Sequence, residues 1–425
     1  MSWNRWYTTR SYIRTAIWIV PLIALVVEQV VIRAVAAIDA RVDWVPLIGA
    51  SAAGTLGEMD TVVTLTMSFI VFAFSSMLVA IQVASGQLTP RIIATTLLRD
   101  NVIRSTVGLF VFTLLFAAGV KARSDDKILY VGGTMAVFLG IGSIMAFLFL
   151  IDYTARLLRP AAIVWLIGEQ GVKVIEAVYP AIIRSPYTPK PVSDRPIEVG
   201  RTVTHHGKSA IVLAVNVQAL VAAASRTGGV VEFVHRVGDF VARNEPLFKL
   251  YRGAAALNDH MLLAQVAFGP ERTIEQDSTF AFRIIVDVAV KALSKAINDP
   301  TTAVLAIDQL HRLLRLVGQR RLHDDVLFDA NGELRVILPT PTWSDFVHIS
   351  FREIRLYGAE NFQISRRLHA MAENLIANLP EPRRAALSQE LELLDRSLAD
   401  LHELPEDLAL ARQPDLQGMG GSFPI

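Results

Sequence analysis

The sequence predicts a membrane protein with four transmembrane α-helices followed by a cytoplasmic α+β region. Two observations predict this fold class. Hydrophobic residues make up 52% of the 425 positions and charged residues only 19%, with a mean hydropathy of +0.41; this composition is more apolar than that of soluble globular chains. The apolar residues are also concentrated in the first 160 positions, whereas the later part alternates between strand-like and helix-like patterns.

The charge and cysteine counts exclude several classes of protein. Lysine and arginine together number 41 and aspartate and glutamate 40, so the net charge of +1 provides no basic field for holding nucleic acid. The chain has no cysteine, which excludes disulfides, thiolate nucleophiles and cysteine-ligated metals or clusters. We also find no catalytic motif, so the sequence predicts neither an enzyme nor a bound cofactor or metal.

Four apolar runs form the predicted transmembrane domain, residues 1–160. They cover about residues 12–38, 61–84, 102–120 and 128–151. At ~1.5 Å per residue, each run is long enough, or nearly so, to cross a hydrocarbon core of ~30 Å. The sequence therefore predicts a multi-pass protein whose first partner is the lipid bilayer.

Basic residues near the ends of the runs predict the orientation. Arginines before the first span, between the second and third, and after the fourth are Arg5, Arg10, Arg14, Arg91, Arg99, Arg104, Arg156 and Arg159. The opposite loops hold only Arg41, Lys121, Arg123 and Lys127. Because short cytoplasmic loops are richer in lysine and arginine, both termini are predicted to be cytoplasmic.

Four further segments follow the spans. Residues 161–198 are expected to form an amphipathic helix and a proline-rich linker. Residues 199–252 show alternating apolar residues and glycine turns, which predict a small β-sandwich module. Residues 253–403 are mainly helix-periodic, with a hairpin near 326–338 whose Asn331-Gly332 suits a tight primed turn. Residues 404–425 are expected to form a disordered tail.

Three strings in the chain carry a recognisable pattern: "SGQLTPRII", "GGVVEFVHRVGDFV" and "RTIEQDSTFAFRIIVDVAVKALSKAINDPTTA". Together with the four-span start, they resemble a family of predicted bacterial membrane proteins, domain of unknown function twenty-two fifty-four. The most specific element is "ALS-x-AINDP-x-TA", where Lys295 stands at a position that is usually proline in the family. The resemblance implies a bacterial inner-membrane protein but brings no reaction, substrate or catalytic residue.

The strand region has a second likeness. The segment "GGVVEFVHRVGDFVARNEPLFKL" resembles half of a lipoyl-type sandwich, in which Gly238-Asp239 makes the turn between two short strands. Carrier domains of that type present a modified lysine at a hairpin tip. This chain lacks the characteristic tip sequence, so we expect a structural β-module without a covalent cofactor.

The second apolar run carries a polar stripe. Thr61, Ser68, Ser75 and Gln82 recur every seven residues, so their side chains share one face of a helix. Two interpretations remain open. Small hydroxylated residues let membrane helices pack closely and hydrogen-bond, and the same groups can line a wet pathway when several copies surround an axis.

Glu28 lies inside the first apolar run. A carboxyl group there is costly unless it is protonated, paired or facing water. It either reaches the outer interface or takes part in the passage of an ion or proton, and the sequence favours neither interpretation.

The string "AINDPTTA" interrupts about forty helix-periodic residues. Asn298 tolerates the left-handed conformation that ends a helix, Asp299 can cap the next helix, and Pro300 suits its first position. A capped corner therefore explains the string. The functional alternative is a polar site at this corner, formed by Asp299 and Asn298 with Arg272 and Asp277, facing an ion, a ligand or a neighbouring subunit.

The sequence thus favours a homo-oligomeric, channel-like or transport-related membrane protein. Its candidate path residues are Thr61, Ser68, Ser75, Gln82 and Glu28, and its cytoplasmic part would assemble or gate the path. The alternative is a membrane-anchored cytoplasmic sensor or scaffold that binds a ligand or protein. Self-association and a small ion or ligand are the expected interactions besides lipid, and nucleic acid is not.

Overall fold

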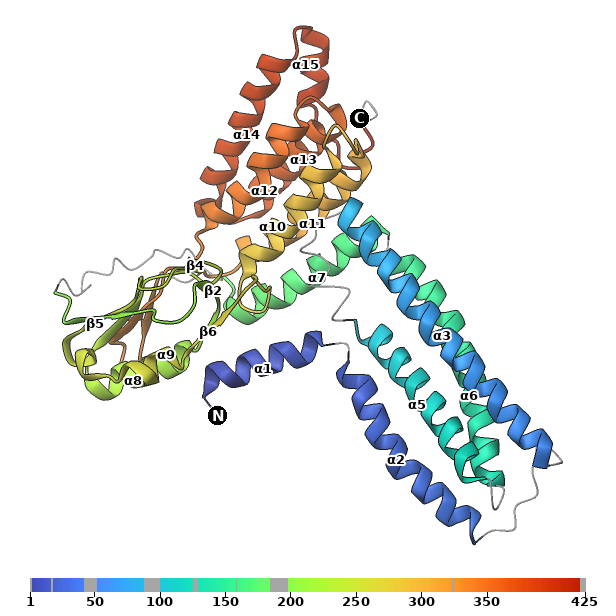
Figure 1. Cartoon of the computed structure of the whole chain (residues 1–425). Helices are drawn as coiled ribbons and strands as arrows, with labels where there is room; N and C mark the ends of the chain where they lie inside the picture. The colour runs from blue at the N-terminus through green and yellow to red at the C-terminus, as the bar shows by residue number, and fades with distance from the viewer. Residues whose placement is uncertain are drawn as a thin grey trace. The chain divides into compact units, whose positions relative to one another are not determined.

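The computed structural model describes residues 2–16, 18–41, 52–87, 100–124, 129–157, 159–183, 198–322 and 325–420. The chain divides into two compact units. We call Tyr12–Gly86 with Pro90–Ala162 the span unit, and Met1–Ser11, Gln87–Thr89 and Ile163–Ile425 the globular unit. Figure 1 labels the helices α1 to α15 that the structure describes and some of the strands.

The span unit contains four helices that are long and apolar enough to cross a membrane. They are α2 (Ile19–Asp39), α3 (Ala52–Gln87), α5 (Asn101–Arg123) and α6 (Tyr130–Leu157). In α3, the stretch that meets this criterion is Gly54–Val79. The predicted succession of four apolar helices followed by a mixed region of helices and strands is therefore confirmed.

The predicted start of the first span is wrong. Residues Trp3–Thr15 form a separate helix, α1, and the first apolar helix begins only at Ile19. The start of α1 belongs to the globular unit, where Tyr7 packs with Leu213 and Ala267. This helix is polar on average, and its Trp3 and Tyr7 pack in a cluster with residues of β2 and β6.

Glycines on α6 let the span helices approach closely. A Cβ at Gly140 would lie 2.8 Å from a methyl group of Val62, and one at Gly133 would lie 2.9 Å from the methyl of Met59. Deeper in the same bundle, Ser143 donates a hydrogen bond of 3.1 Å to Thr113. Small and hydroxylated residues of the fourth span therefore serve helix packing.

Two sheets organise the first half of the globular unit. The five-stranded sheet has the order β1-β5-β3-β8-β7 and the three-stranded sheet the order β4-β2-β6. The strands are β1 (Arg201–Thr204), β2 (Ala210–Val215), β3 (Val230–Phe233), β4 (Phe240–Val241), β5 (Pro246–Tyr251), β6 (Val266–Gly269), β7 (Val326–Phe328) and β8 (Leu334–Ile337). All pairs are antiparallel except β3 with β8.

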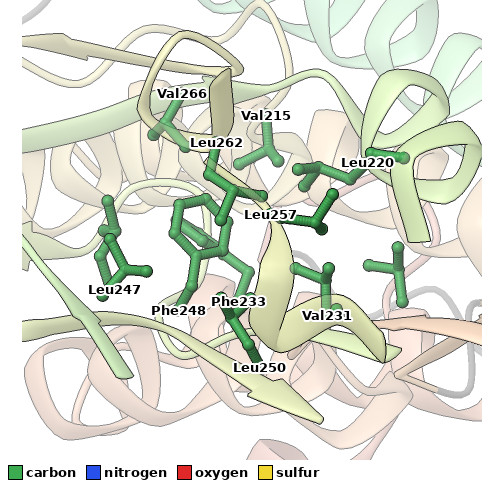
Figure 2. Packing of buried hydrophobic residues seen from close by; sticks show 14 of the residues in the cluster. Val215, Leu220, Val231, Phe233, Leu247, Phe248, Leu250, Leu257, Leu262 and Val266 are labelled. Carbon is green, nitrogen blue, oxygen red and sulfur yellow. The ribbon is translucent and has the colours of Figure 1, made fainter. Parts of the chain in front are cut away.

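Figure 2 shows the apolar core of this region. Phe233 and Phe248 come from neighbouring strands, and their ring centroids lie 5.3 Å apart. Leu220 of helix α8 and Leu262 of helix α9 are fully buried in the same cluster. Both sheets and the short helices thus share one hydrophobic core.

The predicted sandwich of residues 199–252 is wrong in its boundaries, and its lipoyl-like pattern is not found. Helix α8 (Val217–Thr227) interrupts the strands, capped by Asn216 and ended by Gly228 in the left-handed conformation. Strands β6, β7 and β8 come from outside the predicted range. Short elements η2 (Arg252–Ala256) and α9 (Asp259–Leu263) connect β5 to β6. The sheets therefore need residues up to Ile337, which local alternation cannot reveal.

The hairpin near 326–338 is present as β7 and β8, but its turn differs from the predicted primed turn. Gly332 has φ +77°, whereas Asn331 has no positive φ. The N–H of Gly332 donates to the carbonyl of Asp329 at 3.0 Å, so an ordinary turn is followed by a left-handed glycine.

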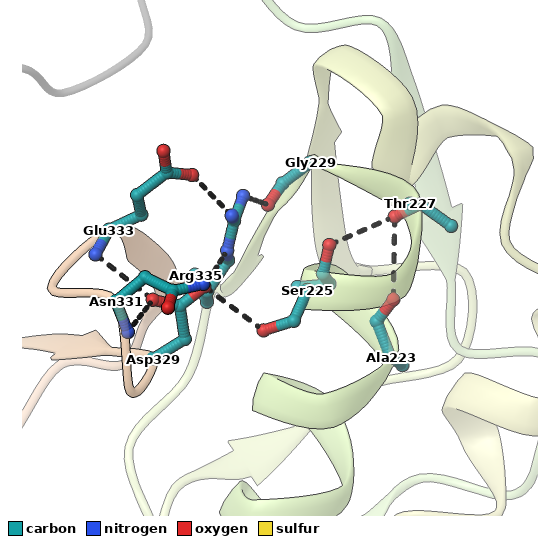
Figure 3. Close-up of polar contacts among 9 residues, drawn as sticks. Ala223, Ser225, Thr227, Gly229, Asp329, Asn331, Glu333 and Arg335 are labelled. Carbon is teal, nitrogen blue, oxygen red and sulfur yellow. Dashed lines mark hydrogen bonds and ion pairs between the residues drawn. The ribbon is translucent and has the colours of Figure 1, made fainter.

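Figure 3 shows what fixes this hairpin to α8. Arg335 is buried and Asp329 half-buried, and they form an ion pair of 2.7 Å. Asp329 also accepts a hydrogen bond from Ser225 of α8, and Arg335 donates to the carbonyl of Gly229. Arg335 and the backbone N–H groups of Glu333 and Asn331 lower the pKa of the Asp329 carboxyl, because they stabilise its charged form.

The rest of the globular unit is helical. Helix α7 (Pro160–Val178) leads into it from the fourth span helix, and the later helices are α10 (Ser278–Ala292), α11 (Pro300–Gly318), α12 (Trp343–Gly358), α13 (Phe362–Asn378), α14 (Glu381–Leu401) and α15 (Pro405–Arg412). The predicted proline-rich linker falls mostly on residues 184–197, outside the described residues.

The expectation of a disordered tail from residue 404 is wrong for most of its length. Pro405 starts α15, with Glu406 and Asp407 in the first turn, where carboxylates favour a helix. Beyond it, Asp415 accepts hydrogen bonds from the N–H groups of Gln417, Gly418 and Gly420. The last five residues lie outside the described part.

Candidate functional site

The polar stripe of α3 faces away from its own bundle. Thr61, Ser68, Ser75 and Gln82 are all exposed, whereas Thr66, on another face, is buried. The hydroxyl of Thr61 donates to the carbonyl of Gly57 and that of Ser68 to the carbonyl of Thr64, both at 2.9 Å. The donors are therefore satisfied within the helix, and the oxygen lone pairs remain on the surface of the span unit.

Glu28 does not share a surface with the stripe. Its residue is only 2% exposed, and it lies in α2 against α5, close to Gly119. The side chain of Gln29 donates to its carboxylate at 2.7 Å. Five path candidates thus divide into an exposed row on α3 and a buried acid on α2.

The residues of the predicted polar corner lie at two separate places in the structure. Asp277 caps the start of α10, and Asp299 caps the start of α11 beyond the other end of α10. Because α10 has 15 residues and a helix rises ~1.5 Å per residue, about 22 Å of helix separates them. A continuous helix therefore prevents Arg272, Asp277, Asn298 and Asp299 from forming one site.

At Asn298 and Asp299 the structure has the predicted capped turn. Asn298 has φ +49°, Asp299 accepts from the N–H of Thr302 at 3.1 Å, and Pro300 is the first residue of α11. The N–H of Asp299 also donates to the carbonyl of Ala292, which closes the turn.

At the other end of α10, Asp277 borders a cavity that the sequence did not reveal. The cavity has a volume of about 590 Å³ and lies within the globular unit. Its walls come from seven segments: α1, the end of α7, the β2–α8 junction, the loop after β3, the residues before α10, the start of β7 and the residues after β8. Its volume falls in the range of pockets for small organic ligands.

Asp277 is held in this wall by an ion pair. Its Oδ2 accepts from Nε of Arg272 at 2.9 Å, and its Oδ1 accepts from the N–H of Phe280 at 3.1 Å. Gly238, with φ +94°, passes directly over the pair, and any Cβ there would collide with both charged groups. The glycine of the predicted strand turn is thus required for close approach as well as for its φ.

Asp325 contributes a second carboxylate. It has φ +59°, and its Oδ1 accepts from the N–H and the hydroxyl of Thr340 at 2.7 and 2.9 Å. Glu275 contributes a third, and its Oε1 accepts from the hydroxyl of Ser11 at 3.4 Å. Three carboxylates from two segments, the residues before α10 and the start of β7, therefore reach one cavity.

Aromatic side chains complete the walls. Tyr179 is 1% exposed and packs edge-on against Phe346, with ring centroids 6.3 Å apart. Burial raises the pKa of its hydroxyl to about 12, against a lowering hydrogen bond with Ser278, so the group stays protonated. Trp3 of α1 also lines the cavity, and it stacks on Tyr7 with ring centroids 5.3 Å apart.

The first helix is tied to the end of α9 by specific bonds. The N–H of Asn4 donates to the carbonyl of Ala264 at 3.1 Å, and the side chain of Asn4 donates to Leu263. Only the mixed nature of α1, two aromatic residues four apart within a polar helix, hints at this docking in the sequence. Within the described ranges, no group of three or more histidine or acidic side chains could hold a metal ion.

Comparisons with known proteins give a family and no activity. A family model described as predicted membrane protein (DUF2254) matches residues 14–374. An uncharacterised protein of Mycobacterium bovis and one of Mycobacterium tuberculosis are each 26% identical over 422 residues, which covers 93% of this chain and 78% of the relative. No solved structure matches.

Proposed function

Because the chain belongs to the family of predicted membrane proteins DUF2254, we propose that it acts as a homo-oligomeric, channel-like or transport-related protein of the bacterial inner membrane. Both termini and the globular unit lie in the cytoplasm in this proposal. Helix α3 of each copy turns its polar stripe toward a shared axis, and the globular units assemble or gate the path. The role requires no catalytic step.

The exposed stripe of α3 carries the proposal. A lipid-facing helix surface gains nothing from hydroxyl and amide groups, since hydrocarbon offers their oxygens no hydrogen bond. The four residues are exposed in the single chain, so packing within the chain does not use them. Another copy of the chain, or water, can form hydrogen bonds with these four residues.

The seven-residue spacing supports contact between copies. Residues seven apart drift by only ~20° around a helix, so the stripe runs almost parallel to the α3 axis. A strict repeat of seven is the period by which helices wind around one another in a left-handed supercoil. Copies of α3 around an axis would bring Ser68, Ser75 and Gln82 into successive rings.

Ion flux from liposomes tests the proposal. The variants Ser68→Leu, Ser75→Leu and Gln82→Leu should each lower flux at least ~10-fold, because leucine removes polar groups from a narrow path. Ser105→Leu, at an exposed position of α5, makes the same chemical change and should leave flux intact. A strictly monomeric mass in lipid, or equal flux from all four variants, would refute the role of the stripe.

The cavity in the globular unit supports a second candidate function, a membrane-anchored sensor. Its walls include α1 and the end of α7, and these helices connect along the chain to the first and fourth span helices. A ligand there could alter either connection. Screening small molecules for a rise in melting temperature of the full-length protein tests this role.

A further inference from the structure

We propose that the cavity of the globular unit binds a small organic cation, an amine that carries an aromatic or aliphatic portion. This inference rests on the sensor role and names its ligand class. It does not depend on ion flux through the span unit. The size of the cavity, the charge of its walls and their aromatic side chains each limit the ligand.

The sign of the charge follows from the wall residues. Glu275, Asp277 and Asp325 line the cavity, and the described lining contains no lysine, arginine or histidine. Arg272, behind the wall, offsets the charge of Asp277. Asp325 has no ion pair with any described residue, and its Oδ2 accepts no hydrogen bond within the described ranges. An ammonium group of a ligand would supply an ion pair to Asp325 and a hydrogen bond to its Oδ2.

An anion is disfavoured although two helices begin at the cavity. The start of α8 is capped by Asn216 and that of α10 by Asp277. Each cap accepts one N–H of the first turn, that of Ala219 at α8 and that of Phe280 at α10, and at α10 an anion would meet the carboxylate of Asp277. The helix ends consequently add no anion site.

A bare metal ion is disfavoured by the number of ligands. A divalent ion needs several oxygen ligands at 2.0–2.6 Å, roughly six or more. No described group of three acidic or histidine side chains is close enough to form such a set. An amine needs only two or three acceptors, and its carbon portion fits the rest of the wall.

The remaining walls suit that carbon portion. Trp3 and Tyr179 offer aromatic surface, and Val217, Val237 and Leu338 offer aliphatic surface. Aromatic faces attract a cation that lies within ~6 Å of the ring centre. The ligand would thus join the carboxylate of Asp325 to Trp3 on α1, the helix that leads to the first span.

Three indole compounds of nearly equal size test the ligand class. Tryptamine is a cation, tryptophol is neutral and indole-3-acetate is an anion at pH 7. Their binding to the full-length protein in detergent micelles is measured by calorimetry. Tryptamine should bind at least ~10-fold more tightly than tryptophol, and indole-3-acetate should bind most weakly. Equal affinities, or no binding of tryptamine at millimolar concentration, would overturn the proposal.

Substitutions then locate the binding site. Asp325→Asn keeps an acceptor for Thr340 and tolerates a positive φ, so the fold should persist, but tryptamine affinity should fall about tenfold. Glu406→Gln, exposed on α15, removes the same charge elsewhere and should leave affinity unchanged. Unchanged preference for tryptamine in Asp325→Asn, or binding of Ca²⁺ alone at this site, would contradict the proposal.

The same titrations separate this inference from the sensor role. If tryptamine binds with the expected preference but neither flux nor the mobility of the span helices responds, the ligand class stands and the sensor role fails. If tryptamine does not bind, the ligand class fails, and the sensor role is then judged by the wider screen.

Discussion

His311 on α11 is held neutral by the groups around it. Arg367 donates to its Nδ1 at 3.2 Å, and since a guanidinium only donates, the ring proton must sit on Nε2. Nε2 lies 3.0 Å from Oδ1 of Asn374 and donates to it. Burial lowers the pKa of His311, and the positive charges of Arg367 and Arg315 add to this effect.

The neutral ring predicts a loss of stability in mild acid. Below about pH 6.5 the unfolded chain binds a proton at this histidine that the folded chain binds only at lower pH. The stabilisation is therefore complete above that pH and is lost as pH falls through the folded-state pKa. Melting temperatures of the full-length protein between pH 7.5 and 5 measure this loss of stability. The melting temperature of the His311→Gln variant should fall less steeply over this range. Parallel curves would contradict this account.

Asp299 gives a second prediction at the scale of one residue. Its carboxylate caps α11 through the N–H of Thr302, so Asp299→Ala should lower the free energy of unfolding by about 1 kcal/mol. Asp299→Asn keeps the acceptor and should lose much less. Chemical denaturation measures both. If Asp299→Ala abolished flux without loss of stability, the turn would be a functional site and not only a cap.

Residues that act locally could be predicted from sequence, and residues that converge could not. Asn298, Asp299 and Pro300 were predicted correctly, because a cap depends on neighbours within four positions. The cavity was not predicted. Trp3, Tyr179 and Asp325 are more than 140 positions apart in the chain, and only the tertiary fold brings them into one wall.

At the scale of elements, the glycines of α6 differ in how closely a neighbouring helix approaches them. A Cβ at Gly140 would press on Val62, whereas nothing lies within 4 Å of one at Gly142. Gly140→Leu should therefore lower stability by roughly 1–3 kcal/mol through overpacking. Gly142→Leu places the same side chain on the same helix without that clash. Melting temperatures in micelles compare the two, and an equal drop would show that close approach of α3 and α6 is not the cause.

The existence of the span helices followed from composition, whereas their ends did not. Apolar length alone predicts a helix that can cross a bilayer, but the polar α1 runs almost directly into the apolar α2 in the sequence. Their division depends on the docking of Tyr7 against β-strand residues far along the chain. Helix α8 was missed although its alanines favour a helix, because the apolar alternation on both sides of it predicts strands.

On the scale of the whole molecule, the account depends on a polar row at the surface of an apolar unit. The span unit exposes large side chains such as Met145 and Leu148, as a lipid-facing surface should. Ser68 and Ser75 are exposed on α3 and suit water or another copy. The proposed oligomer with an axial path would account for this mixture of surfaces.

Thiol labelling tests this central claim most directly. The chain has no cysteine, so Ser68→Cys, Ser75→Cys, Met145→Cys and Leu148→Cys each carry a single thiol. Met145 and Leu148 are apolar residues of α6, 68% and 61% exposed in the single chain, and they serve as controls on a helix without the stripe. A charged, membrane-impermeant methanethiosulfonate reagent is added to liposomes, and its rate with each variant is measured.

A thiol reacts through its thiolate, which forms only where water reaches it. The account predicts that the cysteines at positions 68 and 75 react at least ~10-fold faster than those at positions 145 and 148. Equally slow reaction at all four positions would contradict a wet path along α3.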